Sequence, residues 1–189
     1  MIIGITGSFG SGKTTVANMF RRYGFKVIDV DKLYHKDFYK SHPLRNKIKK
    51  AFGTLDRGKL KKIVFNDCKK LQKLNKITHP IIIKKTKEEI QKNYHHENPD
   101  EIKIIVDIPL LFEARLEKLF DKIIVVKADK KTQISRILRE KKYSKREIEQ
   151  IIESQMPLKE KIKKADFVVE NSKSIKETEK QIKSIIASL

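Results

Sequence analysis

Residues 7–14 of the sequence read Gly-Ser-Phe-Gly-Ser-Gly-Lys-Thr, and this stretch decides the fold. It fits the pattern G-x-x-x-x-G-K-[ST], in which the backbone N–H groups of a glycine-rich loop surround phosphate oxygens. Lys13 would reach the β- and γ-phosphates, and the Thr14 hydroxyl can ligate the Mg²⁺ that bridges them. A glycine-rich turn that binds nothing is the alternative. The pattern predicts a binding site for a nucleoside triphosphate, formed by Gly10, Ser11, Gly12, Lys13, Thr14 and Thr15. Within this site we expect Lys13 to be catalytic as well and Thr14 to be a metal ligand as well.

The residues on both sides place this loop between a strand and a helix. Apolar residues 2–5 predict a buried strand, and the apolar positions within 14–23 predict a helix that ends at Gly24. The next apolar run, 25–28, predicts a second strand. Strand, loop, helix and strand in this order form a βαβ unit.

The rest of the chain extends this unit into a larger sheet. Apolar runs at 103–107, 122–127 and 167–169 predict three more strands. Residues 31–100 show no convincing strand, and their spacing predicts helices, one starting at His42-Pro43 and one interrupted at His79-Pro80. Alternating strands and helices predict an α/β fold, a five-stranded parallel sheet flanked by helices, as in P-loop NTPases. We expect a nucleotide-binding core (1–30, 101–130 and 166–189), a helical substrate domain (31–100) and a helical lid (131–165).

The net charge of the 189-residue chain is +20, from 44 Lys and Arg against 24 Asp and Glu. Such a field attracts polyanions, either nucleic acid or a phosphorylated metabolite. Nucleic-acid readers often use Arg forks and stacked aromatic rings, whereas this chain has few Arg and no Trp. The composition therefore favours a solvated, Lys-rich surface and makes a nucleic-acid partner unlikely.

Composition also indicates where the protein works. The lone Cys68 allows no internal disulfide, and no apolar run approaches the roughly 18 residues of a membrane helix. The sequence opens on the first predicted strand without a basic leader segment. We expect a cytoplasmic protein with no membrane partner, either a monomer or a weak homo-oligomer.

Three aspartates follow predicted strands, at the edge of the sheet where ligands of open parallel sheets bind. Asp29 and Asp31 follow the second strand, and either could orient or deprotonate an attacking hydroxyl, hold a magnesium ion, or cap a helix. We favour a functional role for Asp31 over one for Asp29, and we keep Asp29 as a candidate metal residue. Asp107, at the end of the third strand, is a second candidate metal residue or a cap before Pro109.

Two arginines follow the fourth strand. Arg136 and Arg139 stand on one helical turn, where P-loop kinases place a lid whose arginines clamp ATP phosphates. A solvated helix face is the alternative. His79, before Pro80, could cap a helix, pack or touch substrate.

Together these residues make the chain resemble the dephospho-CoA kinase family nearly end to end. Residues 4–17 are similar to the start of that family, and 27–31 match its strand end with two aspartates. The more specific segments, in family order, are Asp56-Arg57, His79-Pro80, residues 107–113, Gln133 with Arg136, Gln155, and residues 165–171.

The resemblance implies an activity, in which ATP phosphorylates the ribose 3′-hydroxyl of dephospho-CoA to give CoA and ADP, the last step of coenzyme A biosynthesis. It implies Mg²⁺ as cofactor, ATP as co-substrate and dephospho-CoA as acceptor. Asp31 would orient or deprotonate the hydroxyl, and Arg136 would contact ATP. The acceptor pocket would include Arg57, His79, Leu110, Leu111, Phe112 and Glu113.

The chain departs from the family pattern in its substrate domain and in its lid. The loop between Gly53 and Asp56 is shorter than usual. Ile151 and Glu140 stand where the family tends to have lid arginines, and Lys145 or Arg146 are candidates to replace them. Two other functions stay open: another small-molecule or nucleotide kinase with a different acceptor, and a basic nucleic-acid-binding NTPase.

Overall fold

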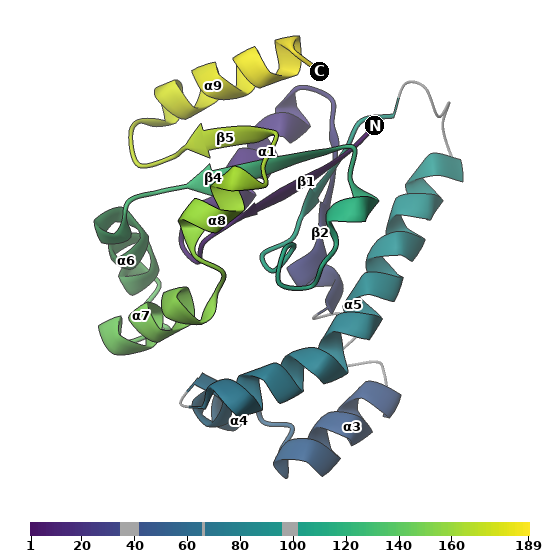
Figure 1. Cartoon of the computed structure of the whole chain (residues 1–189), viewed down its shortest axis with the longest axis vertical. Coiled ribbons are helices and arrows are strands. Elements are labelled where there is room, and N and C mark those ends of the chain that lie inside the picture. The colour runs from purple at the N-terminus through teal and green to yellow at the C-terminus, as the bar shows by residue number, and fades with distance from the viewer. Residues whose placement is uncertain (35–41, 66, 96–101) are drawn as a thin grey trace. The chain divides into compact units, whose positions relative to one another are not determined.

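The computed structural model describes residues 1–34, 42–65, 67–95 and 102–189. The chain divides into two compact units, which Figure 1 shows in one view. The first unit comprises Met1–Asp29 and Asn93–Leu189, and the second comprises Val30–Lys92. The predicted lid, 131–165, lies within the first unit, and its behaviour as a lid stays a prediction.

The first unit is built on a five-stranded sheet with the strand order β2-β3-β1-β4-β5. Every neighbouring pair is parallel, which confirms the predicted α/β fold. The apolar runs are the reason these segments form strands, because both faces of the sheet are covered. The five strands match the five predicted ones: β1 (Ile2–Gly7), β2 (Lys26–Asp29), β3 (Ile104–Asp107), β4 (Lys122–Lys127) and β5 (Phe167–Glu170).

Helices of the first unit begin at residues that can cap them. Asp129, Ser144 and Ser174 each accept a hydrogen bond from a backbone N–H three residues later, and the two serines form capping boxes. Figure 1 shows α6 and α7 beyond the carboxyl end of β4. The helices are α1 (Lys13–Arg22), α6 (Lys130–Arg139), α7 (Lys145–Ser154), α8 (Leu158–Lys163) and α9 (Ile175–Ala187), with a short 3₁₀ helix, η1 (Glu117–Leu119).

The core of this unit follows the two-residue alternation of strands. Ile3 and Ile5 of β1 are fully buried and pack with apolar residues of the adjacent strands and of α1 and α9. Gly4 points to the other face, where a Cβ atom would approach the Leu111 side chain to 2.7 Å. This close approach explains a glycine in the middle of the first strand.

The second unit is helical throughout its described part. Residues 30–34 are helical, followed by α3 (His42–Phe52), α4 (Arg57–Phe65) and α5 (Cys68–His95). Asp56 accepts from the Lys59 N–H and caps α4. Asp67 caps α5 by accepting from the N–H groups of Lys69 and Lys70, as Asp and Asn do at helix starts. The described part of the second unit has a small core that includes Leu44, Ile48, Leu60 and Val64.

The predicted interruption at His79-Pro80 is wrong, because α5 is one helix of 28 residues that contains Pro80 in its interior. Proline lacks an N–H and removes one backbone hydrogen bond from a helix interior. Packing offsets this loss, since Ile77 and Ile81 on either side of Pro80 both contact the core of the second unit. Among the described helices, none is long and apolar enough to cross a membrane.

Candidate active site

The loop between β1 and α1 has the backbone conformation that phosphate binding requires. Gly10 and Gly12 have φ angles of 77° and 86°, a left-handed conformation that other residues rarely adopt. Gly12 is the residue at which α1 starts, and the Ser11 N–H donates to the Ser8 carbonyl at 3.1 Å. Consecutive turns of this kind direct N–H groups into one concavity, to which the N-terminus of α1 adds its positive dipole.

Lys13 lies over this loop. Its ammonium group donates to the Ser8 carbonyl at 3.0 Å and to the Gly7 carbonyl at 3.3 Å. The charge is therefore held at the loop by the chain itself. An anion in the concavity would find a cation already in place.

The Thr14 hydroxyl donates to the Asp107 carboxylate at 2.8 Å, although 93 residues separate them in the sequence. Asp107 is 5 % exposed and ends β3, where its register partner is Asp29 at the end of β2. The structure thus brings together the three predicted metal residues at the carboxyl edge of the sheet. Among the described residues no group of three or more His, Cys, Asp or Glu side chains forms a metal cluster. Mg²⁺ does not require one, because it commonly binds one or two protein carboxylates together with waters and substrate phosphates.

Of the two predicted lid arginines, one reaches the loop. Arg136 donates from Nη1 to the Ser11 carbonyl at 3.3 Å and from Nη2 to the Asn171 carbonyl at 2.7 Å. Arg139 is exposed in the last turn of α6. The guanidinium of Arg136 therefore lies beside the phosphate loop, while Arg139 faces solvent.

Residues that the sequence patterns gave no role support the tip of the loop. The Phe9 N–H donates to the Gln155 side chain at 3.0 Å, and the Phe9 ring meets the Tyr143 ring edge-to-face with centroids 5.3 Å apart. Gly10 lies against α6, since a Cβ there would approach the Ile137 side chain to 2.6 Å. Only Gln155 had a sequence signal, as part of the family resemblance.

The segment from Leu110 to Glu113, predicted to touch the acceptor, lies mostly inside the protein. Leu111 is fully buried, Phe112 is 3 % exposed and Leu110 is half-buried. The Glu113 carboxylate forms an ion pair with Lys161 at 2.8 Å and accepts from the Met156 N–H at 2.9 Å. Glu113 thus ties this segment to α8. The sequence gave no sign of the fully buried Lys161, one lysine among many.

The remaining predicted residues belong to the second unit. Asp31 is exposed in the 30–34 helix, Arg57 is exposed at the start of α4, and His79 is half-buried within α5.

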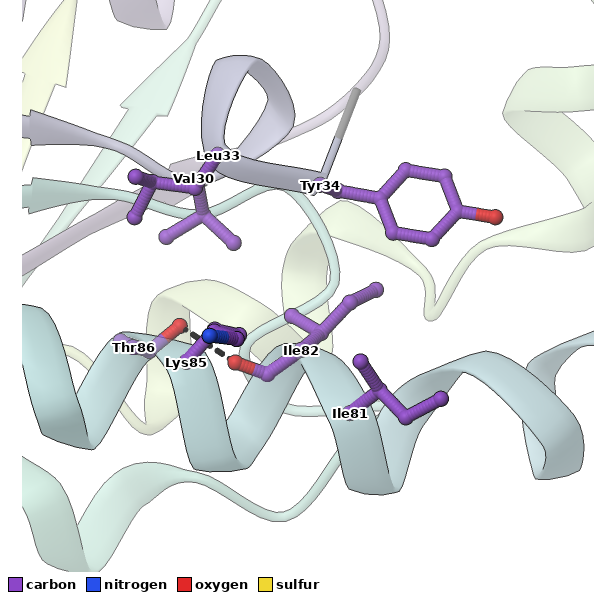
Figure 2. Close-up of a pocket in the computed structure, with 7 residues that line it drawn as sticks. All are labelled: Val30, Leu33, Tyr34, Ile81, Ile82, Lys85 and Thr86. Carbon is purple, nitrogen blue, oxygen red and sulfur yellow. Dashed lines mark hydrogen bonds between the residues drawn. The ribbon is translucent and has the colours of Figure 1, made fainter. Parts of the chain in front are cut away.

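The second unit also contains a small open hollow between the 30–34 helix and α5. Figure 2 shows side chains of the 30–34 helix facing those of α5 across it. Burial raises the pKa of Tyr34 to about 12, against the opposing effect of the Arg57 charge. Arg57 and His79 are not among its lining residues, which are Val30, Leu33, Tyr34, Ile81, Ile82, Lys85 and Thr86.

The parallel sheet, the loop of residues 7–14 and the Thr14–Asp107 contact define a protein of the P-loop NTPase fold. A family model described as dephospho-CoA kinase matches residues 1–177. The chain belongs to the dephospho-CoA kinase family, as the resemblance implied.

Relatives and solved structures agree with this assignment. The chain is 38 % identical over 195 residues to the dephospho-CoA kinase of Bacillus cereus, covering 98 % of this chain and 96 % of that protein. The structure of dephospho-CoA kinase from Campylobacter jejuni is similar with a TM-score of 0.68 and 31 % identity, covering 99 % of this chain and 96 % of that one. TT1252 from Thermus thermophilus is similar with a TM-score of 0.79 and 34 % identity, covering 100 % and 97 %.

Proposed function

We propose that the chain transfers the γ-phosphoryl group of ATP to the ribose 3′-hydroxyl of dephospho-CoA, giving CoA and ADP. One observation carries the proposal: the hydrogen bond between Thr14 and Asp107 beside a glycine-rich loop, in a chain of this family. A hydroxyl and a carboxylate side by side at this loop support a site for the β- and γ-phosphates and their metal ion.

The first unit would bind ATP. Phosphoryl transfer has a loose transition state, so catalysis depends on positioning and on neutralising charge on the phosphate oxygens. The N–H groups of the loop and α1 would surround the phosphates, and Lys13 would move from its two carbonyl partners onto them. Arg136 would add a second cation from α6.

Magnesium fits the residues present. Thr14 and Asp107 offer hard oxygen atoms, which Mg²⁺ prefers, and Asp29 stands next to Asp107 across the strand pair. We propose that Thr14 and Asp107 would hold the ion, with Asp29 as a further candidate residue for it. When bound, Mg²⁺ neutralises charge on the transferred group.

The acceptor side would use the second unit and the segment from Leu110 to Glu113. Asp31 would orient the 3′-hydroxyl and accept its proton, while Arg57 and His79 would contact the acceptor. The helices of 131–165 would close over the bound substrates and exclude water, which otherwise hydrolyses the γ-phosphate. We also propose that the enzyme works in the cytoplasm, as its single cysteine suits a reducing compartment.

A coupled ADP-release assay tests this function, with dephospho-CoA, AMP, adenosine and shikimate offered in parallel. We expect ADP with dephospho-CoA alone. ADP formed with adenosine or shikimate but not with dephospho-CoA would assign the chain to another kinase activity. Filter binding of DNA and RNA at moderate salt tests the nucleic-acid alternative, and we expect nonspecific retention to collapse as salt rises.

Asp31→Asn tests the base. Loss of a general base typically costs about 10²–10⁴-fold in rate, so turnover should fall while ATP affinity stays nearly unchanged. Asp67→Asn is the matched control, since it removes the same charge from the same unit and asparagine caps a helix equally well. A wild-type rate in Asp31→Asn would refute the base assignment.

A further inference from the structure

Asn171, just after β5, connects the phosphate loop to two distant elements. Its side-chain nitrogen Nδ2 donates to the Ser11 carbonyl at 2.8 Å, across 160 residues of sequence. Its oxygen Oδ1 accepts from the Thr178 hydroxyl of α9 at 3.0 Å, and its N–H donates to the Lys127 carbonyl of β4 at 2.8 Å. The side chain is 4 % exposed, so these bonds form away from bulk water.

The partners determine which end of the amide faces the loop. A carbonyl oxygen only accepts hydrogen bonds, so the Ser11 carbonyl requires the donor Nδ2. Oδ1 then faces Thr178, whose hydroxyl also approaches the Ser174 carbonyl at 3.3 Å. The amide is thereby held in one orientation.

The Ser11 carbonyl receives two side-chain donors, Nδ2 of Asn171 and Nη1 of Arg136. This carbonyl and the Gly12 N–H belong to one planar trans peptide and point in opposite directions. Two donors that hold the carbonyl outward therefore direct the Gly12 N–H to the opposite side, toward the phosphate position.

Gly12 is matched to this arrangement by its lack of a side chain. A Cβ atom at this position would overlap Nδ2 of Asn171 and come within 3.3 Å of Nη1 of Arg136. The second glycine of the loop pattern thus makes room for the group that orients its own peptide.

We propose that Asn171 is a positioning residue for catalysis: it fixes the Ser11–Gly12 peptide so that the Gly12 N–H binds the triphosphate. The inference rests on the proposed function, since it requires the triphosphate to lie in the loop. Asn171 would act without touching ATP, through the Ser11–Gly12 peptide alone. A residue that binds the nucleotide base would instead contact ATP directly.

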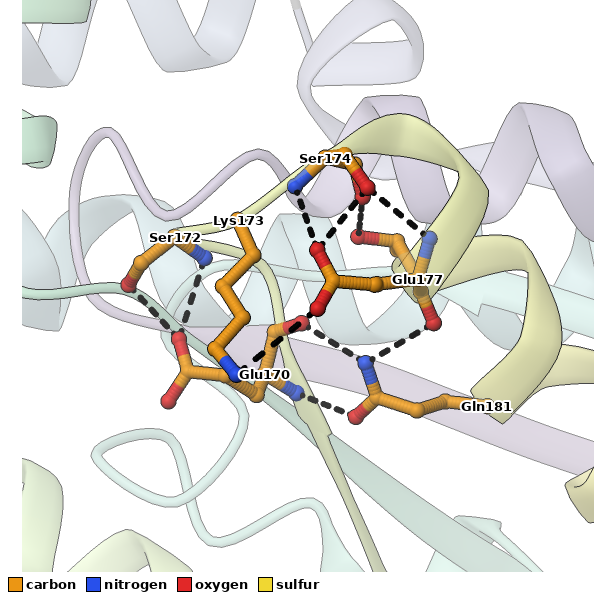
Figure 3. A network of polar contacts seen from close by, with 7 residues as sticks. Glu170, Ser172, Lys173, Ser174, Glu177 and Gln181 are labelled. Atoms are coloured by element: carbon orange, nitrogen blue, oxygen red, sulfur yellow. Dashed lines mark hydrogen bonds and ion pairs between the residues drawn. The ribbon is translucent and has the colours of Figure 1, made fainter.

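A nearby network supplies a control for stability. Figure 3 shows Gln181 bonded to both backbone groups of Glu170, the residue before Asn171, with both distances at 2.9 Å. Gln181 also donates to the Glu177 carbonyl at 3.2 Å, so its bonds stay within β5 and α9. Gln181→Leu should weaken the same junction and leave the phosphate loop unchanged.

The test measures binding of Mg²⁺-ATP and of inorganic tripolyphosphate, which has no base, to the wild type and four variants by calorimetry. Asn171→Leu should weaken the binding of both ligands by the same factor, about tenfold for the lost buried hydrogen bond to the Ser11 carbonyl. In the ADP-release assay its KM for ATP should rise while the KM for dephospho-CoA stays constant. Gln181→Leu should lower the melting temperature without changing either affinity. Thr178→Val should weaken both ligands to a smaller extent, and Thr178→Ser, which keeps the hydroxyl, should restore them.

Each other outcome is decisive. Unchanged affinities in Asn171→Leu, or a loss for ATP but not for tripolyphosphate, would overturn the positioning role and leave the proposed function intact. If Asn171→Leu does not fold, equal affinities in Thr178→Val and the wild type would overturn it. A wild-type chain that binds neither ligand would refute the proposed function and this inference with it.

Discussion

The two units of the chain are ordered by different kinds of contact. In the first unit, the phosphate loop is held by Asn171 and Arg136, which are 160 and 125 residues from Ser11. In the second unit, Asp56 and Asp67 each accept a hydrogen bond from an N–H three residues later, and the described part of this unit has a core that includes Leu44 and Ile48. The unit proposed to bind ATP is thus positioned by long-range contacts, and the unit proposed to bind the acceptor is built largely from local helical order. Substitutions in the first unit should therefore affect ATP binding and turnover, whereas substitutions in the core of the second unit should affect stability without changing ATP affinity.

The largest effect is expected from Lys13→Ala in the first unit. Removing a cation that neutralises the transferred phosphoryl group should lower kcat/KM by about a thousandfold or more. The fold should persist, because the Lys13 ammonium donates to carbonyls of the loop itself and is not part of the hydrophobic core. ADP release and thermal melting measure both properties, and normal turnover would refute the role of the loop.

Next in size is Lys161→Met, which leaves the partly buried Glu113 carboxylate without its cationic partner. Breaking a buried ion pair typically costs about 3–5 kcal/mol in the free energy of unfolding. Lys163→Met is the control on the same helix, since the Lys163–Glu160 pair is also 2.8 Å long but its side chains are 69 % and 50 % exposed. Exposed pairs contribute about 0–1 kcal/mol. Equal losses in the two variants, measured by denaturant unfolding, would contradict the structural importance of Lys161.

Leu44→Ala tests the second unit. Leu44 is fully buried in its core, and truncations of this kind cost about 2–5 kcal/mol. Because the phosphate loop belongs to the first unit, ATP affinity should stay at the wild-type value. Leu138→Ala, at a 40 % exposed leucine, is the control and should change stability little. A parallel fall in ATP affinity in Leu44→Ala would mean that the two units are not independent in this respect.

The smallest effect is expected from Glu177→Gln at the start of α9, and it concerns how the stability of the fold depends on pH. Hydrogen bonds from the Ser174 hydroxyl and N–H lower the pKa of Glu177 below its ordinary value of 4.5. A lowered pKa in the folded state means that the carboxylate stabilises the fold above pH 4.5 and that this contribution disappears as the pH falls through the folded-state value. The stability difference between wild type and Glu177→Gln should therefore shrink on acidification. A difference that stays constant with pH would contradict the role of the charge.

Much of the first unit could be predicted from the sequence because its signals are local. The apolar runs identify all five strands, and the pattern of residues 7–14 identifies the loop. Gly24, predicted to end α1, has the left-handed φ of 85° that such an ending uses. The continuity of α5 through Pro80 could not be predicted, since it depends on packing by Ile77 and Ile81.

The candidate site was predictable only in part, because some of its residues follow from local patterns and others depend on contacts that form only on folding. Lys13 and Thr14 follow from a contiguous pattern, and Asp107 follows from its place at a strand end. The contacts of Asn171 and the burial of Lys161 depend on side chains that meet only after folding. The family resemblance includes Asn171 in residues 165–171 but gives it no contact, and nothing in the neighbouring sequence marks Lys161. Glu113 was singled out in advance, since the resemblance assigns it to the acceptor pocket. Its ion pair with Lys161 could not be predicted from the sequence.

A crystal structure of the chain with Mg²⁺ and a non-hydrolysable ATP analogue tests the central claim most directly. We predict the triphosphate within the loop of residues 7–14, with Lys13 on its outer phosphates and the metal ion beside Thr14 and Asp107. Nucleotide bound elsewhere, with the loop empty, would contradict the account.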